Sequence, residues 1–105
     1  EEAAARGQEV FEGKGQCATC HEGTLYTHST LHEPAETGMD DVYAMRSATG
    51  LYRVTPLRAL WQHPPYFHDG SAATLADVVT HYDDTLGLAL DESERSDLVQ
   101  FLLSI

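Results

Sequence analysis

The hydrophobic positions of the C-terminal segment follow the spacing of an amphipathic α-helix. One helical face collects four apolar residues at positions i, i+3, i+4 and i+7: Leu98, Phe101, Leu102 and Ile105. Asp91 is followed three residues later by Glu94, which is the arrangement of a helix capping box. A helix is therefore predicted from about Asp91 to the end of the chain.

A second stripe with the same period lies upstream. It comprises Leu75, Val78, Val79 and Tyr82. Thr74 followed by Asp77 supplies the N-terminal cap that such a helix needs. A helix is therefore predicted after Thr74, with Tyr82 on its apolar face and His81 pointing away from that face toward solvent.

The N-terminal segment is predicted to form a third helix, from about Ala3 to Glu12. One face of it collects Ala3, Gly7, Val10 and Phe11. Gly7 lowers the helix propensity of this segment. A glycine on a buried face is typical of a place where another backbone approaches closely, so we expect such an approach at Gly7.

The middle of the chain has weak periodicity. Residues 23–50 are loop-like, apart from one short helical possibility from Met39 to Arg46. Prolines at positions 56, 64 and 65 allow only short helix between Val54 and Asp69. Because the chain shows neither strand alternation nor an internal repeat, residues 1–105 are predicted to form one all-α domain.

The charge of the chain restricts its partners. Six basic residues against seventeen acidic ones give a formal net charge of −11. Nucleic acid and anionic membranes are poor partners for such a surface, whereas a basic protein would be attracted to it. No run of about 18 apolar residues exists, so no membrane span is predicted.

The only two cysteines lie in the run Cys17-Ala18-Thr19-Cys20-His21. C-x-x-C-H is the attachment signature of c-type haem. The two intervening residues let one turn of chain carry both thiols to the two vinyl groups on one haem edge, and His21 is then directed toward the iron. We therefore predict one covalently bound haem c, with Cys17 and Cys20 as thioethers and His21 as an iron ligand.

Two other interpretations of this run are weaker. A structural zinc site needs about four ligands, and His28 and His32 are the residues that could complete one. A redox dithiol or disulfide of the C-x-x-C type normally lies in a βαβ unit, and no strand pattern surrounds this run.

Haem c is attached outside the cytoplasm, which predicts a periplasmic or extracellular bacterial protein. The chain begins with Glu1-Glu2-Ala3 and shows no leader sequence. It is therefore expected to be a mature protein or a domain of a longer secreted one.

The order of these features resembles a class I cytochrome c. In that fold the first and last helices cross at a small residue, here Gly7 against the Leu98–Phe101 face, and loops and short helices wrap the haem. Three further runs resemble the C-terminal, electron-transferring domain of bacterial di-haem cytochrome c peroxidases and of the methylamine dehydrogenase maturation enzymes. They are the runs 54–58, 65–71 and 74–79, namely Val-Thr-Pro-Leu-Arg, Pro-Tyr-Phe-His-Asp-Gly-Ser and Thr-Leu-Ala-Asp-Val-Val.

This resemblance implies a function in electron transfer. The related enzymes carry two haems in two domains, whereas this chain has one C-x-x-C-H run. Similar single-haem domains are modules of secreted proteins and are proposed electron donors to partners such as lytic polysaccharide monooxygenases. The expected function is an electron carrier for an extracytoplasmic redox partner, and the alternative is a peroxidase-like enzyme with an open or displaceable distal site.

The ligand opposite His21 determines the chemistry. Tyr82 is favoured, because it faces the core and because the related peroxidases and maturation enzymes place methionine or tyrosine at this helix end. His68 is the main rival, at a separation from His21 that is typical of small cytochromes. The remaining candidates are Met39, Met45, His63 and His81. Either tyrosine or histidine predicts a low midpoint potential.

Three other side chains are expected near the haem. Arg53 is predicted to offset the charge of the haem propionates, with Arg58 as a neighbouring cation. Trp61, the only tryptophan, is expected to pack against the haem or to cover the core. If His68 is not a ligand, it is expected to bond to a propionate or to backbone.

Overall fold

The computed structural model describes residues 1–105 and contains three α-helices. They are α1 (Glu2–Glu12), α2 (Leu75–Leu86) and α3 (Glu92–Ser104). Four short 3₁₀ turns interrupt the loops, at Cys17–Thr19, Pro34–Thr37, Ala44–Arg46 and Leu60–Gln62. Extended pairing is limited to two isolated bridges, so the all-α prediction is confirmed.

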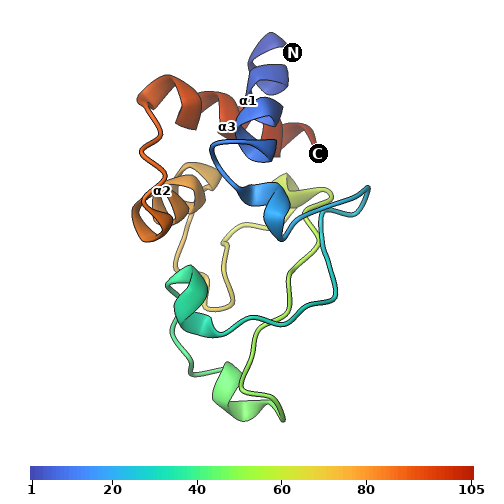
Figure 1. Ribbon diagram of the computed structural model, residues 1–105, viewed down its shortest axis with the longest axis vertical. Coiled ribbons are helices and arrows are strands. Elements are labelled where there is room, and N and C mark those ends of the chain that lie inside the picture. Colours follow the sequence, from blue (N-terminus) through green and yellow to red (C-terminus); the bar gives the residue numbers. More distant parts are fainter.

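The helices gather at one end of the molecule. Figure 1 shows α1 and α3 crossing at this end of the long axis, with α2 beside α3 and the connecting loops filling the other end. Only 15 of the 105 residues are buried, because much of the apolar surface faces a cavity. None of the helices combines the length and the apolar character that a membrane span requires.

The crossing of α1 and α3 depends on Gly7. A Cβ atom at this position would lie 1.9 Å from the backbone oxygen of Asp97 and 2.8 Å from Cβ of Phe101. No side chain fits into that space, so the two backbones are in contact. The expected close approach at Gly7 is confirmed, with Asp97 and Phe101 as the contacting residues.

The predicted helix boundaries agree with the structure. In α2 the Thr74 side chain accepts a bond from the Asp77 amide, and the Asp77 carboxylate accepts one from the Thr74 amide. Asp91 and Glu94 form the same reciprocal pair at the start of α3. These bonds satisfy backbone N–H groups that have no partner within the helix.

The helix expected from Met39 to Arg46 is reduced to the single turn Ala44–Arg46. Asp40 explains the difference. Its carboxylate accepts a bond from the Val42 amide at 3.1 Å, and its backbone oxygen accepts one from the Tyr52 hydroxyl at 2.9 Å. Both bonds hold this stretch in a turn, as is typical of aspartate before a short loop.

Two ion pairs join α3 to the other two helices. Arg6 of α1 donates to both carboxylate oxygens of Asp97, at 2.8 and 3.1 Å. This hydrogen bonding holds the pKa of Asp97 below its ordinary value. Arg95 donates to Asp83 of α2 at 3.0 Å.

Asp83 is the buried carboxylate that joins α2 to the start of α3. It also accepts a bond from the Leu90 amide at 3.1 Å. Asp83→Ala leaves this buried amide without a partner and is expected to lower the free energy of unfolding by about 2 kcal/mol. Urea denaturation of the haem-loaded protein, followed by circular dichroism, measures the change. Asp84→Ala, which removes the exposed neighbouring carboxylate, is the matched control, and an equal loss in both variants would contradict the assignment.

Candidate haem site

A large, mainly apolar cavity lies between the helices and the loops. Its volume is about 550 Å³, within the range of cofactor pockets, and 17 of its 27 lining residues are hydrophobic. All three helices contribute to the wall, through core residues such as Phe11, Val79 and Leu98. A large apolar group is therefore the kind of ligand that this space accommodates.

Both cysteines line this cavity and are free thiols. The 3₁₀ turn Cys17–Thr19 places them, with the His21 amide donating to the Cys17 oxygen at 2.9 Å. The turn starts at Gln16, whose backbone is in the left-handed region. Burial raises the pKa of Cys17 to about 11 and raises that of Cys20 as well.

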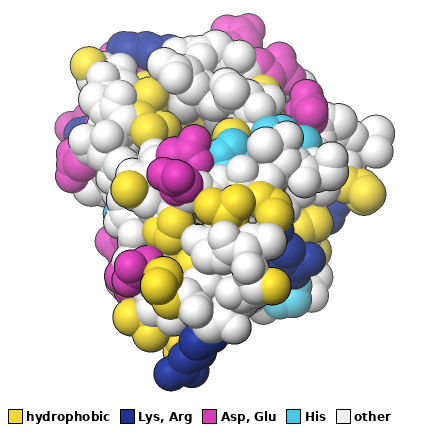
Figure 2. All heavy atoms as spheres, turned by 60° about the horizontal axis from the view of Figure 1, so that its bottom comes forward, with side chains coloured by type: hydrophobic (Ala, Val, Ile, Leu, Met, Phe, Trp, Pro, Cys, Tyr) yellow, Lys and Arg dark blue, Asp and Glu magenta, His cyan; other side chains and the backbone are white.

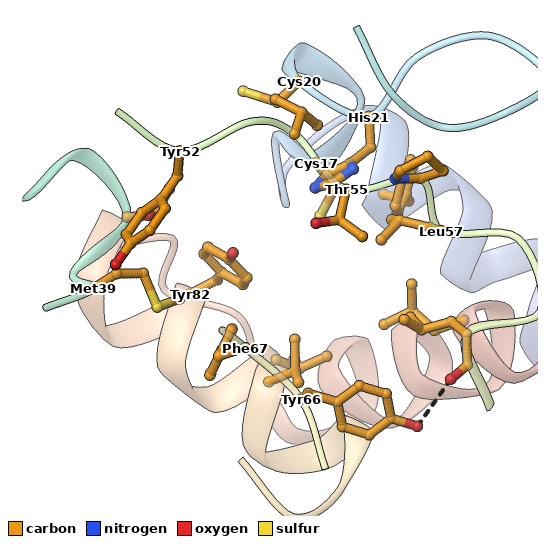
Figure 3. A pocket seen from close by; sticks show the side chains of 18 of the residues that line it. Cys17, Cys20, His21, Met39, Tyr52, Thr55, Leu57, Tyr66, Phe67 and Tyr82 are labelled. Atoms are coloured by element: carbon orange, nitrogen blue, oxygen red, sulfur yellow. Dashed lines mark hydrogen bonds between the residues drawn. The ribbon is translucent and has the colours of Figure 1, made fainter. Parts of the chain in front are cut away.

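His21 is oriented by the backbone of a neighbouring loop. Its Nδ1 lies 2.9 Å from the backbone oxygen of Tyr26, and because a carbonyl only accepts, the proton is on Nδ1. The lone pair of Nε2 is then free, which is how metal-binding histidines are commonly held. Burial lowers the pKa of His21, so the ring stays in the neutral form that binds metal. Figure 3 shows the ring directed into the cavity.

These residues fit a covalently attached haem c. Two thiols at C-x-x-C spacing lie beside an oriented neutral imidazole, at the edge of a deep apolar cavity. The thiols match the two vinyl groups, the imidazole matches the iron, and the apolar wall matches the macrocycle. The predicted roles of Cys17, Cys20 and His21 are compatible with this geometry.

Two side chains approach the cavity from the side opposite the cysteines. Tyr82 of α2 directs its ring into the space, and Met39 extends its thioether from the loop after the turn Pro34–Thr37 (Figure 3). Burial raises the pKa of Tyr82 to about 12 in the chain itself. Tyr82 lies where the sequence predicted, and Met39 is a second residue within reach of the same region.

The other candidates for the iron ligand opposite His21 lie less favourably relative to the cavity. Met45 is 70% exposed and His81 does not line the cavity. His81 was expected to face solvent, but it is half-buried, with Nε2 2.6 Å from the Thr37 oxygen. His63 lines the cavity from an exposed position.

His68 is held at the edge of the cavity. Its Nε2 lies 3.1 Å from a carboxylate oxygen of Asp40, and its ring stacks on Tyr52 with centroids 4.7 Å apart. These contacts hold the imidazole against Asp40 and Tyr52, which both lie in loops. This arrangement is closer to the expected bonding role than to that of an iron ligand.

The two arginines beside the cavity differ in their contacts. Arg58 donates to the Thr24 oxygen at 2.7 Å and covers the Tyr26 ring. Arg53 lines the cavity from an exposed position and has no ion-pair partner in the structure. Its guanidinium is therefore free of other charged partners, and the pairing of Arg53 with haem propionates stays a prediction.

The expectation for Trp61 is wrong. Its side chain is 53% exposed and does not line the cavity, because the turn Leu60–Gln62 directs Leu60 inward instead. Sequence reasoning missed Phe67, whose ring lies in the cavity beside Tyr82 with centroids 5.8 Å apart. Phe67 has a left-handed backbone and belongs to no periodic stripe, so no helical or strand pattern marks it.

Comparisons with known proteins show the family to which this chain belongs. No protein-family model matches the chain. Methylamine utilization protein MauG from Methylorubrum extorquens is 31% identical over 94% of this chain and 33% of the relative. Cytochrome c551 peroxidase from Nitrosomonas europaea is 33% identical over the same shares. The chain is a domain of the cytochrome c peroxidase and MauG family. Its relatives are haem c proteins, which agrees with the C-x-x-C-H run of this family domain.

A solved structure supports the fold of this family domain. It is the crystal structure of a MauG-like protein associated with microbial copper homeostasis, with a TM-score of 0.77 and 23% identity over 99% of this chain. The chain covers 46% of that protein and about a third of the length of the curated relatives it matches. An all-α cytochrome c-like fold is thereby confirmed.

Proposed function

We propose that this domain carries one covalently attached haem c and transfers electrons to an extracytoplasmic redox partner. The observation that supports this is the pairing of His21 on one side of the cavity with Tyr82 and Met39 on the other. If His21 and either Tyr82 or Met39 bound the iron of a haem held here, the chain would supply both protein ligands itself and would leave no position for a substrate. A haem held here supplies a one-electron couple between ferric and ferrous iron.

The surrounding residues favour the oxidised state of such a centre. A tyrosine oxygen from Tyr82 stabilises ferric iron, and the formal net charge of −11 acts in the same direction. Arg53 offsets part of the propionate charge. We therefore infer a low midpoint potential.

The acidic surface indicates the kind of partner. A protein with a basic docking face would be attracted over a distance of about 10 Å at moderate ionic strength. Because haem c is attached outside the cytoplasm, we infer a periplasmic or extracellular location. The partner is then a secreted or periplasmic oxidoreductase.

One observation favours peroxide chemistry as a second candidate. His68 and Asp40 form a hydrogen-bonded pair at the cavity edge, and such a pair can move a proton. Four of the relatives are named cytochrome c peroxidases. This alternative needs an open or displaceable position opposite His21.

Spectroscopy of the ferric protein separates the two proposals. We expect a low-spin electron paramagnetic resonance signal, slow cyanide binding and no turnover of hydrogen peroxide, because both axial positions are filled. A high-spin signal with fast cyanide binding and peroxide turnover would contradict electron transfer and support the peroxidase-like function.

A further inference from the structure

Two histidines lie side by side in the loop that follows the C-x-x-C-H run. The rings of His28 and His32 are parallel, with centroids 5.2 Å apart and planes within 5°. Their Nε2 atoms are 2.9 Å apart. The sulfur of Cys20 lies 3.8 Å from the same atom of His32. The three ligand atoms together fall within 4.8 Å of one another. His32 also lines the haem cavity, whereas His28 does not.

A carboxylate lies on the outer side of each ring. Glu36 is 3.4 Å from Nδ1 of His32, and Glu22 is 3.8 Å from Nδ1 of His28. Negative charge next to Nδ1 favours the proton on that nitrogen. Each ring is thereby biased to direct the lone pair of its Nε2 toward the other ring.

Neutral rings can form one hydrogen bond between the two Nε2 atoms, but not with both outer carboxylates facing a protonated Nδ1. If both protons are on Nδ1, two lone pairs face each other across 2.9 Å. If one Nε2 instead carries a proton, that ring turns a lone pair toward its own carboxylate, Glu22 or Glu36. A cation between the two Nε2 atoms removes both conflicts.

We propose that His28 and His32 bind one first-row transition-metal cation of the class that prefers imidazole, such as Zn²⁺ or Cu²⁺. Two metal–nitrogen bonds of about 2.0–2.1 Å span 2.9 Å at an angle of about 90° and span about 3.3 Å at the tetrahedral angle. The observed separation lies within a few tenths of an ångström of both. The two rings meet nearly end to end, so binding requires each exposed ring to rotate until its lone pair points at the shared ion. Glu22 and Glu36 act as the outer carboxylates that orient each ring.

Backbone hydrogen bonds fix the loop that carries the two histidines, and solvent can still reach their side chains. The His32 amide and carbonyl both bond to the backbone of Tyr52, at 2.8 Å each, which fixes this part of the loop. The side chains of His28 and His32 remain 17% and 22% exposed, so an ion and its water ligands can reach them. Figure 2 shows histidine side chains at the surface beside acidic ones on the loop face, and the formal net charge of −11 attracts cations.

Cys20 distinguishes this site from an ordinary cysteine–histidine metal site. In the haem-loaded chain its sulfur is a thioether, which binds metal weakly and only as a soft neutral ligand. Binding then depends on the two imidazoles. The proposal does not rest on the electron-transfer function, and its failure would leave that function untouched.

The test is a calorimetric titration of the haem-loaded protein with Zn²⁺, which has no redox chemistry and does not disturb the haem spectrum. We expect one saturable equivalent per chain in the wild type and its loss in His28→Ala. Glu36→Gln is expected to weaken binding by about tenfold or more, as is common for an outer carboxylate. Wild-type protein that shows no saturable binding would overturn the proposal.

His28→Ala is the informative variant because His28 does not line the haem cavity. An unchanged haem absorption spectrum shows that the variant is folded. His81→Ala removes a half-buried histidine that lines neither the haem cavity nor this cluster and is the matched control, so it should retain the full equivalent. Undiminished binding in His28→Ala, or loss of binding in His81→Ala, would also overturn the assignment. Because the wild-type stoichiometry is measured first, the test does not depend on any variant folding.

Discussion

Replacing Tyr82 with phenylalanine is expected to convert the ferric haem from a low-spin to a high-spin state. Tyr82 directs its ring into the cavity from α2, opposite the cysteine wall, and phenylalanine keeps the ring while removing the oxygen. Cyanide should bind about tenfold faster or more, since about 1.4 kcal/mol of lost bonding corresponds to a factor of ten. The midpoint potential should rise, because the oxygen donor that stabilises ferric iron is gone. Electron paramagnetic resonance, stopped-flow cyanide binding and a redox titration measure these changes.

Two variants control for the alternatives. Tyr43→Phe removes a hydroxyl from a tyrosine that is 51% exposed, and it should leave the spectrum unchanged. Met39→Leu removes the other donor that reaches this side of the cavity. A low-spin signal that survives in Tyr82→Phe but is lost in Met39→Leu would assign the distal position to Met39 and contradict our choice.

The largest loss of stability is expected from Gly7→Ala. Alanine at this position would place a Cβ 1.9 Å from the Asp97 oxygen, so α1 and α3 must separate. Intrinsic helix propensity predicts the opposite, a gain of about 1 kcal/mol for alanine over glycine. Steric overlap against a backbone atom outweighs that gain, and we expect a net loss of about 3 kcal/mol. The thermal midpoint should fall by roughly 10–20 °C, measured by circular dichroism on the haem-loaded protein.

Gln8→Ala is the control for this effect. Gln8 is the next residue of α1 and is exposed, with only a hydrogen bond to Glu12. Its replacement should change the thermal midpoint little. If Gly7→Ala proved as stable as Gln8→Ala, the helix crossing would have to lie elsewhere.

The sequence predicts the three helices well because their signals are local. A capping pair such as Thr74 and Asp77 and an apolar stripe such as that of α3 involve residues within two or three turns. Gly7 is also recognisable, since a glycine within an apolar stripe conflicts with helix propensity. Its partner is not specified by any local pattern, because the contact joins segments far apart in the chain. The resemblance to class I cytochromes pointed to the Leu98–Phe101 face, and the structure places Asp97 and Phe101 there.

The residues of the candidate site also fall into two groups, those predictable from local sequence and those that are not. Cys17, Cys20 and His21 are predictable because one turn of chain carries all three. Trp61 and Met39 lie in loops, where the direction of a side chain depends on long-range contacts that leave no periodic trace. A 3₁₀ turn directs Trp61 outward, and the position of Met39 follows from a backbone bond to Pro34 at 2.9 Å.

The position of Tyr26 connects the stability of the domain to the redox centre. Its ring packs on Phe11 of α1 and Phe101 of α3, with centroids 5.8 and 6.2 Å away, while its backbone oxygen accepts the bond from His21. A shift at the helix crossing is therefore expected to change the basicity of the imidazole. If the proposed haem is bound, its midpoint potential should report how closely α1 and α3 pack, and substitutions remote from the cavity should change that potential without contacting the cofactor.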